Sequence, residues 1–191
     1  GYRAFLNKIW NATRFALMRI GEGEIRSIDA VNADLTLSDR WILARLNDAV
    51  GKVNHSLAEY RFDAAAQNIY DFFWSQFCDW YIELVKDRLG DDANAPSRQA
   101  ARSVLVHVLD QSFALLHPFC PFLSEELWQN LPLTRAANSF CAQAPYPQSE
   151  ARDDDTAAPM QLIQNAISYV RSARQEGNLP GQMAVPAHYL V

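Results

Sequence analysis

Apolar side chains recur at intervals of three and four residues through most of the first 131 positions, and this spacing limits the fold more than any other feature. It matches the turn of an α-helix, whereas a half-buried strand would alternate polar and apolar residues. The sequence therefore predicts an all-α helical bundle. Its helices are expected at residues 2–20, 38–57, 63–89, 97–116 and 124–131.

Local signals predict where these helices begin and end. Gly21 and Gly23 should end the first helix, and residues 22–37 should form a connection. Pro118 lacks a backbone donor and should end the fourth helix at His117. Side chains that accept hydrogen bonds from free backbone N–H groups should begin the others. The predicted N-cap residues are Ser38 with Asp39, Asp63 and Ser124.

The composition changes after residue 131, where prolines and an acidic run replace the helical pattern. A sixth helix is expected at about 157–176, followed by a strand at 183–191. Because a single strand has no partner, the chain is expected to stop inside a small α/β unit. The predicted domains are a helical bundle at 1–131, an irregular linker crossing at 132–156, and a helix and strand opening a truncated α/β subdomain at 157–191.

The balance of charge restricts the kind of partner. Lys and Arg number 17 against 22 Asp and Glu, so the formal net charge of −5 argues against a globally basic nucleic-acid binder. No apolar run approaches the roughly 18 residues of a membrane span. The cysteines are odd in number and widely spaced, at Cys78, Cys120 and Cys141, which argues against a disulfide framework and a zinc site. They are predicted to be reduced thiols in a cytoplasmic protein. Gly1 in place of an initiator methionine suggests a piece of a longer protein.

The first predicted helix differs from the rest of the chain in charge. Residues 1–21 contain Arg3, Lys8, Arg14 and Arg19 and no acidic residue, so they carry +4 and leave −9 for the remainder. At about 100° per residue, the apolar side chains of this helix gather on one side. These are Leu6, Ile9, Trp10, Thr13, Leu17 and Ile20.

The opposite side of this helix carries Lys8, Phe15 and Arg19, with Asn11 beside them and Arg14 on the flank. A ring that stacks on a base, cations for phosphates and an amide for base edges form the combination that single-stranded nucleic acid requires. The spacing equally allows a plainer interpretation, in which a neighbouring loop covers Phe15 and the charges only solvate a surface helix.

Other groups of polar residues carry weaker signals. His117 and Cys120 could ligate a metal, but two ligands do not make a site, and a helix end explains them better. Asp79 and Glu83 lie one turn apart on the third helix. Paired carboxylates can perform acid–base chemistry, although ion pairs with neighbouring helices are the commoner role. The sequence contains no phosphate-binding glycine loop, no nucleophile elbow and no zinc-protease motif, so no catalytic residue and no metal site are predicted.

Four blocks of sequence resemble the anticodon-binding region of valyl-tRNA synthetases, a family of class I aminoacyl-tRNA synthetases. The blocks are Asn7–Phe15, Leu37–Leu43, Tyr60–Phe62 with Phe77–Glu83, and His117–Phe122 with Glu125–Trp128. Isoleucyl and leucyl relatives share the helical bundle, but the Phe-Cys-Asp-Trp-Tyr block at 77–81 is similar to the valyl enzymes. The resemblance implies a helical bundle of the class I synthetase anticodon-binding type.

In this family the bundle grips the anticodon loop of a valine tRNA. The resemblance implies that Phe15 stacks on a base and that Lys8 and Arg14 contact phosphates or base edges. Asn11 is implied as an edge reader or a support for the helix. Weaker candidates for walls of the same pocket are Cys78, Ile82 and Glu83.

The resemblance also implies what this chain lacks. The parent would be a valine–tRNA ligase that uses ATP and Mg²⁺, whose nucleotide-binding motifs, editing domain and coiled coil are absent from this sequence. The fragment is therefore expected to bind tRNA and the remaining synthetase domains, without a cofactor, a membrane or DNA as partner, and to catalyse nothing. Three alternatives remain open: a helical protein-interaction scaffold whose RNA face has decayed, the equivalent domain of an isoleucyl or leucyl relative, and a helical-bundle enzyme that uses Asp79 and Glu83.

Overall fold

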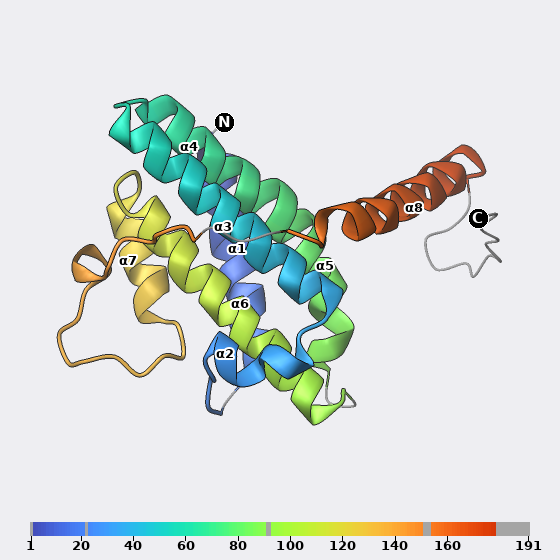
Figure 1. Cartoon of the computed structure of the whole chain (residues 1–191), viewed down its shortest axis with the longest axis horizontal. Coiled ribbons are helices and arrows are strands. Elements are labelled where there is room, and N and C mark those ends of the chain that lie inside the picture. Colours follow the sequence, from blue (N-terminus) through green and yellow to red (C-terminus); the bar gives the residue numbers. More distant parts are fainter. Residues whose placement is uncertain (1, 22, 91–92, 151–153, 179–191) are drawn as a thin grey trace. The chain divides into compact units, whose positions relative to one another are not determined.

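The computed structural model describes residues 2–21, 23–90, 93–150 and 154–178. These residues contain helices and no strand, which confirms the all-α prediction (Figure 1). The strand expected at 183–191 lies outside the described residues. The elements are α1 (Tyr2–Ile20), α2 (Ile28–Val31), η1 (Asn32–Asp34), α3 (Leu37–Ala58), α4 (Phe62–Asp71), η2 (Phe72–Tyr81), α5 (Ile82–Val85), η3 (Lys86–Leu89), α6 (Ala95–Leu116), α7 (Pro121–Gln129), η4 (Cys141–Gln143) and α8 (Ala157–Glu176).

The core of the bundle lies around α6, which packs against α2, α3, α7 and η3. In Figure 1, α3 runs beside the long helix that begins with α4, and α6 lies along the other side of α3, below it in this view. The aromatic side chains Phe73, Phe77 and Phe113 are fully buried between these helices. Such rings bury large apolar areas and account for much of the stability of a small bundle. None of the described helices is long and apolar enough to cross a membrane.

The helix predicted at 63–89 is continuous, but it is not a single α-helix. It begins as α4 at Phe62, becomes a π-helix in η2, returns to α geometry in α5 and ends as the 3₁₀ turn η3. A π-helix has i→i+5 hydrogen bonds and therefore more residues in each turn than an α-helix, and it is frequent at functional sites. The predicted cap was wrong as well, because Arg61 holds the N-cap position and Asp63 lies in the first turn.

Two other predicted caps are also wrong. Thr36, not Ser38, caps α3, and it forms a capping box with Asp39 at the third helical position. Helix α7 begins at Pro121, so Ser124 lies inside it and donates its hydroxyl to the Cys120 carbonyl oxygen at 2.9 Å. The expected connection at 22–37 contains the short helices α2 and η1. By contrast, Gly21 ends α1 as predicted, with a φ of 62° that favours glycine.

The buried face of α1 is rotated from the predicted one. Phe5 and Ala16 are buried, whereas Trp10 is 44% exposed. The rotation follows from the neighbouring helix, because the Phe5 ring packs 4.8 Å from that of Tyr70 and 6.3 Å from that of Phe73. Burying Phe5 turns Trp10 outward, since side chains five positions apart differ by about 140° around a helix.

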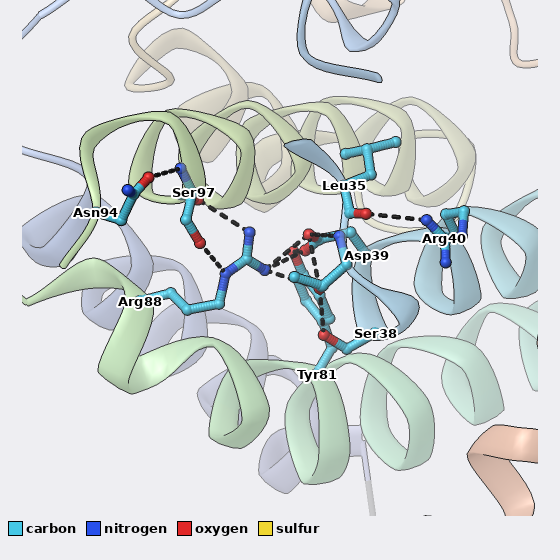
Figure 2. Close-up of polar contacts among 9 residues, drawn as sticks. Leu35, Ser38, Asp39, Arg40, Tyr81, Arg88, Asn94 and Ser97 are labelled. Atoms are coloured by element: carbon cyan, nitrogen blue, oxygen red, sulfur yellow. Dashed lines mark hydrogen bonds and ion pairs between the residues drawn. The ribbon is translucent and has the colours of Figure 1, made fainter. Parts of the chain in front are cut away.

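A buried polar cluster joins α3, the end of η2, η3 and α6 (Figure 2). Asp39 is fully buried, and its two carboxylate oxygens accept hydrogen bonds from Arg88 Nη1 at 2.8 and 2.7 Å. The Tyr81 hydroxyl donates to Asp39 Oδ1 at 2.7 Å. On its other side, Arg88 donates from Nε to the Ser97 hydroxyl at 2.8 Å and from Nη2 to the Ser97 carbonyl at 2.9 Å. Burial, followed by the Asp39 carboxylate, raises the pKa of Tyr81 well above its usual value.

The described chain divides into two compact units, Gly1–Asp153 and Asp154–Val191. Within the first unit, Asn54 donates to the Pro147 carbonyl at 2.9 Å, so part of the predicted crossing is fastened to α3. The second unit contains α8, whose bounds confirm the sixth predicted helix. The three predicted domains, with bounds at 131 and 156, stay a prediction.

Candidate nucleic-acid interface

An open groove of about 550 Å³ lies between α1 and the helix that runs from η2 to η3. We call its α1 side the first wall and its other side the second wall. The first wall consists of Ala4, Asn7, Lys8, Asn11, Ala12 and Phe15, and the second wall consists of Cys78, Ile82, Glu83 and Lys86. First-wall residues three or four positions apart share one face of α1, as do the second-wall residues on their helix.

The groove brings together most of the residues predicted for the site. Lys8, Asn11 and Phe15 meet the three weaker candidates across it. Arg14 does not line the groove; it is exposed on α1. The roles that the resemblance implies for these residues stay a prediction.

Lys8 joins the two sides of the groove. Its Nζ lies 2.6 Å from Asp79 Oδ1 and 3.7 Å from the centre of the Trp74 ring. A cation over an indole face beside a carboxylate is held by two attractions at once. Because the side chains of Lys8 and Asp79 are 24% and 49% exposed, solvent screens this ion pair, and we expect it to orient Lys8 more than to stabilise the fold.

Phe15 is half-buried and lines the open groove. The Arg19 guanidinium lies 5.5 Å and the Lys86 ammonium 5.4 Å from the centre of its ring. Lys86 in turn donates to both carboxylate oxygens of Glu83 at 2.6 and 2.7 Å. The ring therefore lies among cations at a surface that a flat ligand can reach, rather than beneath a covering loop.

Lys86 and Asn7 are groove residues that the sequence did not single out for the site. The signal for Lys86 was present, since it lies four positions after Ile82 and three after Glu83 on one helix face. Asn7 lies four positions before Asn11 and eight before Phe15, and the same angular argument places it with them. Helical spacing extended beyond the strongest candidates would have found both.

The carboxylates proposed for acid–base chemistry are both paired with lysines. Asp79 binds Lys8, and Glu83 binds Lys86. Among the described residues, no group of three or more His, Cys, Asp or Glu side chains is placed to hold a metal ion. His117 forms a 2.8 Å hydrogen bond through Nδ1 to the Ser124 hydroxyl at the end of α6.

The three thiols should differ sharply in reactivity at about pH 8. Burial raises the pKa of Cys78 to about 12, and burial with nearby carboxylates does the same for Cys141. Cys120 is half-buried and its pKa is raised by burial alone. We expect a thiol reagent to modify Cys120 in the folded protein much faster than the other two, as peptide mass spectrometry would report. Rapid labelling of Cys78 in the folded protein would contradict this prediction.

Comparison with known proteins places the chain in a family. A family model described as the anticodon-binding domain of tRNA ligase matches residues 39–189. The chain belongs to this family. The matched range contains the second wall but not α1.

Several curated relatives of this anticodon-binding domain carry the same name, valine–tRNA ligase. The enzyme of Geobacter sulfurreducens is 49% identical over 180 residues, which is 92% of this chain and 20% of the relative. That of Fervidobacterium nodosum is 44% identical over 94% of this chain and 20% of its own length. The Thermotoga maritima enzyme is 42% identical over 187 residues, 98% of this chain and 21% of the relative, so its similarity extends into α1. The chain thus spans about a fifth of the length of these relatives.

A solved structure supports the fold of the anticodon-binding domain. It is a ternary complex of LeuRS, tRNA and LeuAMS from Agrobacterium radiobacter K84, and the match has a TM-score of 0.50 at 26% identity. It covers 77% of this chain and 16% of the solved one. The helical bundle of the class I synthetase anticodon-binding type, expected from the sequence, is thereby confirmed. The leucyl enzyme is a relative in fold, while relatives with 41–49% identity carry the name valine–tRNA ligase.

Proposed function

We propose that this domain binds the anticodon loop of a valine-accepting tRNA within a valine–tRNA ligase. The observation that carries the proposal is the groove between α1 and the η2–η3 helix, where the half-buried Phe15 ring meets two amides, two lysines and a carboxylate. Membership of the anticodon-binding family and the names of the curated relatives support it.

The chemistry of the groove suits an unpaired base. Single-stranded RNA is recognised by stacking a splayed base on an aromatic ring and by hydrogen bonds to its edges. Phe15 supplies the ring, Asn7 and Asn11 supply groups that both donate and accept, and Glu83 supplies an acceptor. In this proposal Lys8 reaches a phosphate or a base edge by exchanging its partner Asp79.

The charge of the groove argues for selective rather than strong binding. The two lysines that line it, Lys8 and Lys86, are already paired with carboxylates. Phosphate contacts dominate affinity for nucleic acid, and salt weakens them. We therefore expect weak, salt-sensitive binding by this domain alone, in which base contacts decide which RNA is preferred.

The activity of the whole enzyme belongs to the same proposal. The parent would attach valine to its tRNA with ATP and Mg²⁺ in the cytoplasm, and this domain would work beside the remaining synthetase domains. The proposal gives ATP and Mg²⁺ to parts of the parent outside this chain.

Binding to tRNA with and without its own anticodon tests the proposal. Fluorescence anisotropy should give tighter binding to a valine tRNA than to the same tRNA with its anticodon replaced, at both low and moderate salt. Equal, weak binding to both would assign the domain only a charge contribution. Loss of all binding at low salt would favour the alternative of a protein-interaction scaffold. That alternative also requires protein to cover Phe15, whereas Phe15 is half-buried along an open groove.

A further inference from the structure

Three of the four second-wall residues, Ile82, Glu83 and Lys86, lie between two buried anchors, and Cys78 comes three residues before the first anchor. Tyr81 comes directly before Ile82, and Arg88 comes two residues after Lys86. Both anchors bind the same carboxylate, that of Asp39 in the first turn of α3. One acceptor on another helix therefore holds this stretch of the second wall at both ends, as Figure 2 shows for the anchor side chains.

The guanidinium of Arg88 fixes the far end of the stretch in two directions. Its Nη1 binds Asp39 on α3, while Nε and Nη2 bind the hydroxyl and carbonyl of Ser97 near the start of α6. Ser97 is itself held, since its backbone N–H donates to the Asn94 side chain at 3.2 Å. A planar group whose donors serve two helices cannot turn or slide without breaking several of these bonds.

Burial restricts the cluster of Asp39, Tyr81 and Arg88 to one set of hydrogen bonds. Asp39 and Tyr81 are fully buried, and the Arg88 side chain is only 16% exposed. A buried donor or acceptor that loses its partner has no water to replace it. The cluster therefore has one low-energy arrangement, and the stretch of helix between its anchors has one position relative to α3 and α6.

We propose that Arg88 and Tyr81 are positioning residues for RNA binding, which set the second wall at the distance from Phe15 that a base requires. They act through the wall and do not touch the RNA. The inference rests on the proposed function, because it names residues that shape the same groove. Hydrogen bonds to a base edge tolerate displacements of only about 0.5 Å, so a small shift of Glu83 is enough to weaken them.

The chain offers a matched control for this test. Arg135 also forms a 2.7 Å ion pair, with Asp110, and its side chain is likewise 16% exposed. It does not line the groove; it lies over the Trp128 ring at 3.5 Å. Arg88→Met and Arg135→Met each remove an arginine–aspartate ion pair, and only the first removes an anchor of the second wall. Because Asp39 is fully buried and the Asp110 side chain is 25% exposed, Arg88→Met is expected to destabilise the fold more, so affinities are compared where both variants are folded.

The experiment measures two quantities for each variant at a temperature where circular dichroism shows it to be folded. One is affinity for valine tRNA, and the other is the rate at which the Cys78 thiol of the second wall reacts with a thiol reagent. We expect Arg88→Met to bind tRNA about tenfold more weakly than the unsubstituted chain, and Tyr81→Phe about threefold more weakly. The affinity of Arg135→Met should stay within about twofold of that of the unsubstituted chain. Cys78 should react faster in the first two variants than in the Arg135 variant.

Equal affinities in the Arg88 and Arg135 variants, or an unchanged Cys78 rate, would overturn the inference, because the anchors would then act only on overall stability. If Arg88→Met does not fold, Tyr81→Phe carries the test, since it removes one hydrogen bond and keeps the ring. If the chain without any substitution binds no tRNA, the proposed function is refuted instead. The Cys78 rates would still decide whether the anchors position the wall.

Discussion

Replacing Asp39 with alanine is expected to lower the free energy of unfolding by about 3–5 kcal/mol. The substitution leaves the Arg88 guanidinium largely buried without its counter-charge and the Tyr81 hydroxyl without its acceptor. It also breaks the capping box with Thr36 at the start of α3. Urea denaturation followed by circular dichroism would measure the loss, and in a bundle of this size such a loss removes a large part of the total stability.

Asp110→Ala is the matched control for Asp39→Ala. Asp110 also pairs with an arginine at 2.7 Å, but its side chain is 25% exposed, so water can solvate what the substitution leaves behind. We expect it to cost about 1 kcal/mol. An equal loss of unfolding free energy in the two variants would show that burial of the Asp39 cluster does not increase the cost of breaking its ion pair.

Replacing Phe15 with alanine is expected to weaken binding to valine tRNA by about 1–3 kcal/mol, the range measured for one base stacked on one ring. The ring lies at an open groove and is not part of the buried core, so the fold should survive the change. Fluorescence anisotropy with the matching tRNA would give the affinity, and circular dichroism would confirm the helix content.

Phe122→Ala provides the comparison for Phe15→Ala. Phe122 is 91% exposed on α7 and does not line the groove, so its loss should leave tRNA affinity unchanged. If Phe15→Ala and Phe122→Ala both bind tRNA as tightly as the unsubstituted chain, Phe15 is not the stacking platform. If both lose affinity to the same degree, the RNA does not lie in the groove.

The helices could be predicted from the sequence because their apolar spacing is a local property. Helices α3, α6 and α8 begin and end within about two residues of the predicted bounds. The caps were harder, since Thr36, Ser38 and Asp39 are all good acceptors and only the fold decides which one begins α3. The π-helix could not be predicted, because no composition or period distinguishes it from a buried α-helix.

The candidate site could be predicted in part for a similar reason. Residues that share a face of α1 are related by angle alone, so Lys8, Asn11 and Phe15 followed from one helix. The second wall came from the family resemblance, and no single-sequence signal links it to α1. The cluster of Asp39, Tyr81 and Arg88 joins residues more than forty positions apart, and it becomes visible only when three helices are placed together.

The π-helical stretch Phe72–Tyr81 makes the length of this chain a determinant of its groove. If one residue were deleted there, for example the exposed Ser75, and the remaining residues kept their present helical geometry, every side chain beyond it would turn by roughly 80–100°. Ile82 and Glu83 would then leave the groove although no groove residue had changed. Substitutions in this stretch should therefore disturb the groove less than deletions, and alignment gaps should be rarer here than the exposure of some of its residues would suggest.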